Sequence, residues 1–92
     1  MAVYVVNHKV ENFDAWKKVY DEFQPVVVKA GIKDHFVLQS ANDKNHVTVI
    51  GEGSLDAVRA FLSSNDLKAA MGDAGVVGKP DIFIGENKRE VN

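Results

Sequence analysis

The order of hydrophobic patterns constrains the fold of this chain more than any other feature. A β-branched run comes first, followed by a long amphipathic helix, two alternating segments, a second helical stretch and a short closing strand. Together these segments fill nearly all of the 92 residues. We expect strands at 3–10, 32–41, 46–53 and from Pro80, and helices beginning near Asn12 and at Ser54.

The first helix is predicted from one wide apolar stripe. Its members recur at steps of three and four residues and are Phe13, Trp16, Tyr20, Phe23 and Val27. Asn12 can cap the first turn, since its side chain accepts from free backbone amides. Pro25 removes a helical hydrogen bond, so we expect a kink or break there, and Gly31 supplies the left-handed stop.

The two central segments are predicted to form a hairpin around a turn of Asn, Asp and Lys at 42–45. If Ala41 pairs with His46, three further pairs follow: Gln39 with Thr48, Val37 with Ile50, and His35 with Glu52. The opposite face of the hairpin is the more apolar one, and we expect it to lie under the helices. It carries Ile32, Phe36, Leu38, Val47 and Val49.

The whole pattern fits a single domain over residues 1–86, since domains typically run to about 100–150 residues. Ser54 is the predicted cap of the second helix, and the stretch 63–65 interrupts that helix before a short continuation. Pro80 is expected to open the last strand, where its missing donor does least harm. Residues 87–92 are predicted to form a charged C-terminal tail.

This order of elements predicts an α+β fold with ferredoxin-like βαββαβ topology. Two right-handed crossovers that share one sheet give four antiparallel strands with both helices on one face. The first strand is then central and antiparallel to the third and fourth. The helices cover one face of the sheet, and the chain has nothing left to cover the other.

The uncovered face of the sheet predicts self-association. An open apolar patch usually marks an interaction site, and small domains gain stability by associating. We therefore predict a homodimer through this face, forming a dimeric α/β barrel with a cavity in each half. The uncovered apolar side chains are expected to be Val37, Ile50 and either Val3 with Val5 or Tyr4 with Val6.

Composition limits the classes of function. The net charge of −2, with basic and acidic residues interleaved, argues against nucleic-acid binding, because phosphate contacts need a clustered positive field. The chain contains no cysteine, which excludes disulfides and thiolate nucleophiles. We see no apolar run long enough to span a bilayer and no pattern of a cleaved signal. A cytoplasmic protein without membrane partners is expected.

Two stretches carry a family resemblance. Residues 7–17 (NHKVENFDAWK) and 66–76 (DLKAAMGDAGV) resemble small dimeric α/β-barrel proteins of the antibiotic-biosynthesis-monooxygenase-like type. The resemblance extends from Val3 to Glu86. It implies a ferredoxin-like dimer whose barrel cavities, in some relatives, oxidise polycyclic aromatics, bind haem or hold small acids.

Relatives that degrade haem border their pocket with an Asn near the end of the first strand and a Trp. Asn7 matches in place, whereas Trp16 lies within the core stripe of the first helix and matches poorly. Those relatives also use a histidine of the second helix as the iron ligand, and residues 54–75 contain no histidine. We therefore expect no haem and no other cofactor, and we interpret Trp16 and Tyr20 as packing residues.

The histidines are the clearest candidates for chemistry. In the predicted pair of His35 with Glu52, the carboxylate favours the protonated ring and can orient it as an acid or base. The alternative is a charge pair at the edge of the sheet. His8 ends the first strand and His46 begins the third, but no further ligand at a diagnostic spacing accompanies them, so we predict no metal site. His8 is expected to be a core histidine bonded to the backbone.

Three functions remain open. The first is a cofactor-independent monooxygenase or cyclase that acts on a small aromatic or polyketide-like molecule, and the resemblance favours it. The second is a non-catalytic small-molecule-binding or stress-associated dimer, and the third is a structural dimer whose barrel is filled by side chains. The candidate catalytic residues are His35, His46, Asn7, Glu52 and His8, and the candidate pocket residues are Val37, Gln39, Thr48 and Ile50.

Overall fold

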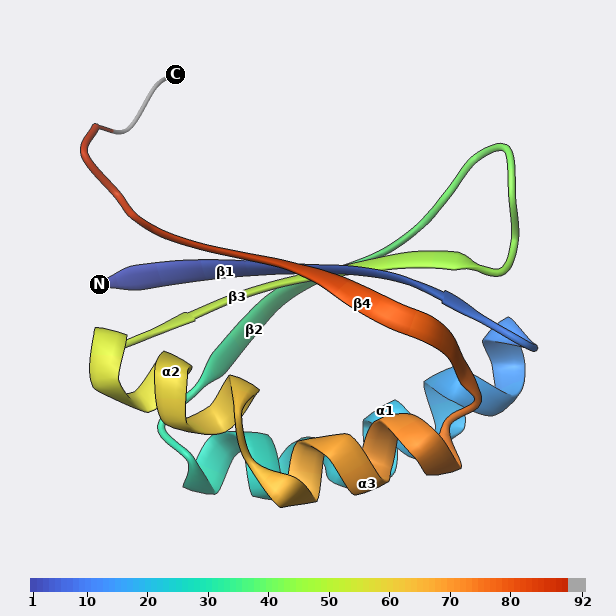
Figure 1. The fold of residues 1–92 in the computed structure, drawn as a ribbon. Helices are drawn as coiled ribbons and strands as arrows, with labels where there is room; N and C mark the ends of the chain where they lie inside the picture. The colour runs from blue at the N-terminus through green and yellow to red at the C-terminus, as the bar shows by residue number, and fades with distance from the viewer. Residues whose placement is uncertain (90–92) are drawn as a thin grey trace.

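The computed structural model describes residues 1–89 and has the expected order of strands and helices (Figure 1). The strands are β1 (Ala2–Val10), β2 (Lys33–Gln39), β3 (His46–Gly53) and β4 (Val76–Glu86). The helices are α1 (Phe13–Lys29), α2 (Leu55–Leu62) and α3 (Asn65–Asp73). The predicted α+β, ferredoxin-like class is confirmed.

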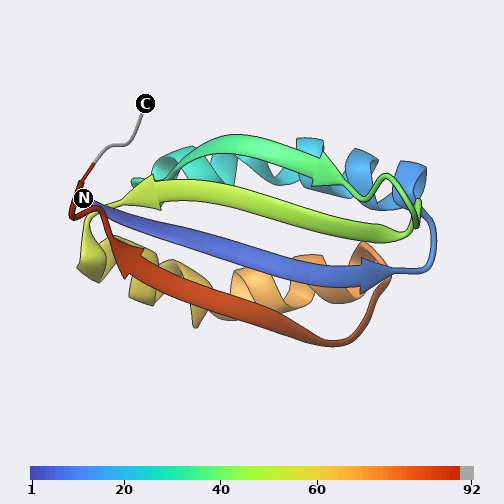
Figure 2. The ribbon, with the colours of Figure 1, turned by 90° about the horizontal axis from the view of Figure 1, so that it is seen from above.

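One antiparallel sheet carries the four strands in the order β2-β3-β1-β4. Strand β1 is central and pairs with both β3 and β4, as expected (Figure 2). The helices lie together beneath one face of this sheet, and no helix of the described residues 1–89 covers the other face (Figure 1). On β1 the residues that face the helices are buried, whereas Val3, Val5 and Asn7 between them point to the uncovered face.

Side-chain caps fix where the helices begin. Asn12 accepts a hydrogen bond of 2.9 Å from the Ala15 amide, and Ser54 accepts one of 3.1 Å from the Ala57 amide. Ser64 caps α3 in the same way, so the predicted interruption after α2 is confirmed. Within residues 1–89, no helix combines the length and apolarity needed to cross a membrane.

Neither proline marks the boundary of an element. The break considered at Pro25 is absent, and helix α1 continues to Lys29, because Pro25 is exposed and the carbonyl left without a donor is close to solvent. Strand β4 begins at Val76, so Pro80 lies inside it. This strand is at the edge of the sheet and shifts register beside Pro80, and Gly78 adopts a φ of +72° in the shifted segment.

The predicted register of the hairpin is also wrong. Gln39 pairs with Val47, and Val37 pairs with Val49, one residue away from the expected partners. Ser40 causes this difference, because its hydroxyl accepts from the amides of Asn42 and Asp43 and ends β2 early.

A β-bulge at His35 separates two registers within β2. Asp34 pairs with Gly51 before the bulge, and Phe36 pairs with Ile50 after it. The expectation that Phe36 and Leu38 lie under the helices is therefore wrong. Both side chains point to the uncovered face and are 59% and 47% exposed.

The core fills the space between the sheet and the helices. Its most completely buried side chains are Tyr4, Val27, Val47 and Val58, from β1, α1, β3 and α2. Helix α3 differs from the other two helices, since it has no buried residue. It packs on the core only through partly buried side chains such as Leu67 and Met71.

We predict that Gly51→Ala destabilises the fold by about 1–3 kcal/mol, the usual range for an overpacked core. A Cβ at this position would lie 2.7 Å from the Tyr4 ring and would also meet the Asp34 carboxylate. The control is Gly72→Ala in α3, where a Cβ would have no heavy atom within 4 Å. Gly72→Ala should be neutral or stabilising by up to about 1 kcal/mol. Urea unfolding of both variants measures the difference, and equal effects would contradict this account of Gly51.

Candidate active site

A cavity of about 60 Å³ lies on the covered side of the sheet, between the strands and the helices. Apolar side chains make up most of its wall, with contributions from α1, α2 and α3. A smaller group of aromatic and polar side chains also lines it: Tyr4, His8, Trp16, Tyr20, Asp34 and Phe61. Enclosed, largely apolar spaces with a few polar groups are where small molecules bind in most proteins.

His8 is the most unusual residue of this cavity. Its side chain is only 6% exposed, and within residues 1–89 neither ring nitrogen makes a hydrogen bond of normal geometry. The expected burial is confirmed. Burial lowers the pKa of His8, so the ring is neutral at neutral pH and carries one donor and one acceptor nitrogen. A neutral imidazole of this kind can accept a proton from a bound hydroxyl group.

Trp16 and Tyr20 form an aromatic wall beside His8. Their rings are stacked, with centroids 5.0 Å apart and an interplanar angle of 18°. The imidazole of His8 lies 5.5 Å from the Trp16 ring. Both aromatic residues do pack in the core, but they also line the cavity, so a flat ligand would meet their side chains.

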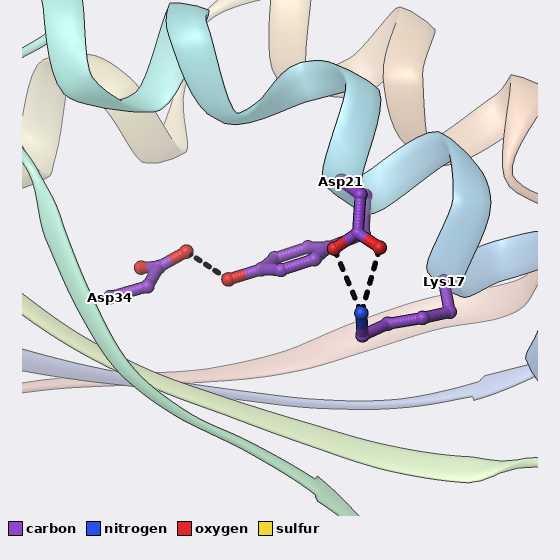
Figure 3. Close-up of polar contacts among 4 residues, drawn as sticks. Lys17, Asp21 and Asp34 are labelled. Carbon is purple, nitrogen blue, oxygen red and sulfur yellow. Dashed lines mark hydrogen bonds and ion pairs between the residues drawn. The ribbon is translucent and has the colours of Figure 1, made fainter.

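Asp34 is held between two tyrosines at another part of the cavity. The hydroxyl of Tyr20 donates to one carboxylate oxygen over 2.5 Å, and the hydroxyl of Tyr4 donates to the other. Figure 3 shows Asp34 reaching from β2 toward α1, in contrast to the outward-facing ion pair of Lys17 with Asp21. Burial, followed by the bond to Asp34, raises the pKa of both phenols, so they remain protonated donors.

The uncovered face carries a second polar group. The Asn7 side-chain oxygen accepts from His46 Nε2 over 2.5 Å and from the Thr48 hydroxyl over 3.3 Å. Because that oxygen can only accept, His46 Nε2 carries the proton in this contact. The structure thus brings together three of the residues singled out from the sequence. Within residues 1–89 the Asn7 amide nitrogen has no acceptor, so it can donate to a further partner.

The structure also brings His35 and Glu52 together. Their Nε2 and Oε1 atoms are 2.5 Å apart, although the predicted register that led to this pair is wrong. The β-bulge explains the contact, because it leaves His35 on the uncovered face beside Glu52. Both side chains are about one-third exposed, at 35% and 28%. This contact alone is therefore a weak, solvent-screened ion pair.

Two of the predicted pocket residues do not lie where they were expected. Val37 and Gln39 pair with Val49 and Val47, which face the helices, so neither lies on the uncovered face. Gln39 instead donates to the Lys44 carbonyl within the hairpin loop. Ile50 does point to the uncovered face, as expected.

His8 and His46 lie toward the same end of the sheet but on opposite faces, so they cannot share one ion. Within residues 1–89, no three His, Asp or Glu side chains are grouped closely enough to hold a metal.

Sequence reasoning missed Asp34. Its alternation with Ile32 was the available signal, because a strand residue two places after a buried one shares its face. The sequence predicts Trp16 and Tyr20 to be packing residues, and the structure shows that they also line the cavity. No sequence pattern indicates that a core stripe also lines a cavity, since both roles require the same apolar side chains.

Neither a protein-family model nor a curated protein matches the sequence. Solved structures nevertheless share its fold. SnoaB, a cofactor-independent oxygenase from Streptomyces nogalater, superposes with a TM-score of 0.79 at 14% identity, over 98% of this chain and 95% of that one.

Two further structures have comparable similarity. A protein from Caulobacter crescentus CB15, provisionally named an antibiotic biosynthesis monooxygenase, gives a TM-score of 0.74 at 19% identity and covers 96% of this chain and 90% of its own. A conserved protein from Methanosarcina mazei Go1 gives a TM-score of 0.73 at 18% identity, and the match covers 96% of this chain and 94% of that one. The chain therefore has the fold of the antibiotic-biosynthesis-monooxygenase proteins, while identities this low establish the fold alone.

We predict that His8 makes folding stability depend on pH. Its folded pKa lies below the ordinary value of 6.5, so the unfolded chain binds the proton first as pH falls. Stability from neutral His8 is thus complete above 6.5 and is lost progressively below it. His8→Leu should reduce the loss of unfolding free energy between about pH 7 and about pH 5, measured by urea unfolding. His35→Gln, which keeps His8, should retain that loss, and an unchanged loss in His8→Leu would contradict the assignment.

Proposed function

We propose that the protein is a cofactor-independent oxygenase acting on a small hydroxylated aromatic molecule in the cavity between sheet and helices. One observation carries the proposal: His8 is buried and neutral, and both of its ring nitrogens are unpaired in an apolar space beside Trp16. Buried polar atoms normally have partners, and an unpaired one in a cavity is suited to a ligand. The shared fold with an oxygenase that needs no cofactor gives independent support.

The chemistry that fits this arrangement begins with a proton transfer. His8 accepts the proton of a phenolic hydroxyl, and the resulting phenolate is electron-rich enough to give an electron to O₂. Recombination at the carbon para to the oxygen forms a peroxide anion, which takes the proton of the His8 imidazolium and becomes a hydroperoxide. Neutral His8 then removes the C–H proton while the O–O bond breaks and hydroxide leaves, which yields the quinone. The hydroxide takes that proton from His8 and becomes water. The substrate supplies all the electrons that reduce the oxygen.

The flat wall of Trp16 and Tyr20 suits the proposed substrate. Aromatic rings prefer offset-stacked or edge-to-face contacts with other rings, and such contacts orient a planar ligand. The surrounding apolar side chains exclude water, which strengthens hydrogen bonds to the developing phenolate.

The test is oxygen consumption with α-naphthol, whose reaction with one O₂ gives the corresponding para-naphthoquinone and one water. We expect quinone formation with matching oxygen uptake by the purified protein. His8→Gln should lower the rate at least about 100-fold, as expected for loss of a general base. Binding without oxygen uptake, measured through quenching of Trp16 fluorescence, would instead support the non-catalytic small-molecule-binding alternative.

His46→Gln tests the other candidate residues. The group of Asn7, His46 and Thr48 remains a proposed site on the uncovered face, and His35 with Glu52 remains a proposed acid–base pair. If His46→Gln abolishes oxygenation while His8→Gln does not, the chemistry lies on the uncovered face. The opposite result assigns it to the cavity beneath the helices.

We also propose that the uncovered face forms a homodimer. Large apolar side chains gather on it, including Phe36 and Leu38 from β2 and Phe83 from β4, which is 66% exposed. Val5 lies between them on the central strand. Burial of apolar area stabilises by about 25 cal/mol per Å², so joining two such faces is favourable by several kcal/mol.

Phe83→Glu should convert the dimer into a monomer at micromolar concentration, because a carboxylate would be buried without a partner. The matched control is Val28→Glu on α1, where the replaced side chain is 70% exposed and away from the sheet. Light scattering measures the mass of each variant. A wild-type protein that is monomeric under these conditions would overturn the dimer.

A further inference from the structure

The Asp34 end of the cavity has a charge that the proposed oxygenation does not use. Among the described residues, Asp34 is the one carboxylate that lines this cavity. Within residues 1–89, no Lys, Arg or His side chain lies within ion-pair distance of it. The two tyrosine hydroxyls satisfy one lone pair on each carboxylate oxygen, and a carboxylate has about four such positions. Asp34 can therefore accept further donors.

Aromatic rings line the same cavity as this carboxylate. Tyr4 and Tyr20 hold it directly, Phe61 lies 6.3 Å from the Tyr4 ring, and Phe23 lies 6.3 Å from Phe61. All of these rings line the cavity. The face of an aromatic ring is electronegative and attracts cations within about 6 Å. A carboxylate that shares its cavity with several aromatic rings forms an environment that favours a positive charge.

We propose that the Asp34 end of this cavity binds the protonated amino group of a small aromatic amine. The inference names the ligand class of the same cavity and so rests on the proposed function for the location of the ligand. An ammonium group donates charge-assisted hydrogen bonds to Asp34 and lies against the ring faces of Tyr4 and Phe61. A carboxylate ligand would be repelled by Asp34 at the same position.

The opposite end of the cavity fits the other half of such a molecule. His8 and Tyr4 lie on the same face of β1, four residues and therefore about 13 Å apart along the strand. The side chains of both residues line the cavity, and Tyr4 donates to Asp34. A phenol that carries an aminoethyl group can place its hydroxyl at His8 and its ammonium at Asp34, with the ring beside Trp16.

The test compares three ligands that differ in one group: tyramine, the uncharged para-ethylphenol, and the anionic para-hydroxyphenylpropanoate. Isothermal titration calorimetry on the wild-type protein should give tyramine at least about a tenfold lower Kd than para-ethylphenol, with the anion weakest. Asp34→Asn should reduce the preference for tyramine to within about threefold. Asp21→Asn is the matched control, because its carboxylate is paired with Lys17 on the outer surface of α1, and it should keep the full preference.

Each result decides the proposal. Equal affinities for the three ligands, tighter binding of the anion, no measurable binding of tyramine, or an unchanged preference in folded Asp34→Asn would overturn it. If Asp34→Asn does not fold, the order of the three affinities in the wild-type protein decides alone. If α-naphthol is oxidised but tyramine has no advantage, this inference fails and the oxygenase stands. If tyramine binds in an Asp34-dependent way but no phenol is oxygenated, this inference stands and the proposed oxygenase function fails.

Discussion

The hydrogen bonds that Tyr4 and Tyr20 donate to Asp34 connect the sheet to helix α1. Through them the edge strand β2 is joined to the central strand β1 and to helix α1, which are the first three elements of the chain. A carboxylate that is partly withdrawn from water needs such donors, since burying it unpaired is costly. The β-bulge at His35 and the absence of a side chain at Gly51 make room for this arrangement.

The same bulge determines which residues the two faces of the sheet display. Asp34 turns inward before it, whereas His35, Phe36 and Leu38 face outward at or after it. One irregularity in an edge strand thus supplies both the charge of the cavity and much of the apolar surface on the uncovered face. The two proposed sites, one for a ligand and one for a second subunit, are coupled through a single strand.

The fold could be predicted from the sequence because its signals are local and repeated. The stripe of α1, the caps Asn12 and Ser54 and the central β1 all depend on residue spacing, which the structure reproduces. The hairpin register could not be predicted, because it depends on the Ser40 hydroxyl and on the bulged residue His35. Neither feature changes the spacing of apolar residues in the sequence. His35 and Glu52 meet in spite of this, since the one-residue slip and the bulge together shift the register by two residues, which keeps His35 on the same face as Glu52.

The weak attachment of α3 has a consequence for access to the interior. Benzene is held by an engineered hole of about 150 Å³ in another protein, which is larger than the about 60 Å³ present here. A guest molecule therefore enters only when a wall moves outward. Leu67, Ala70 and Met71 form part of that wall, and their helix has no fully buried residue to restrain it. Moving α3 away from the core breaks fewer apolar contacts than moving α1, so α3 is the helix expected to move when a ligand enters.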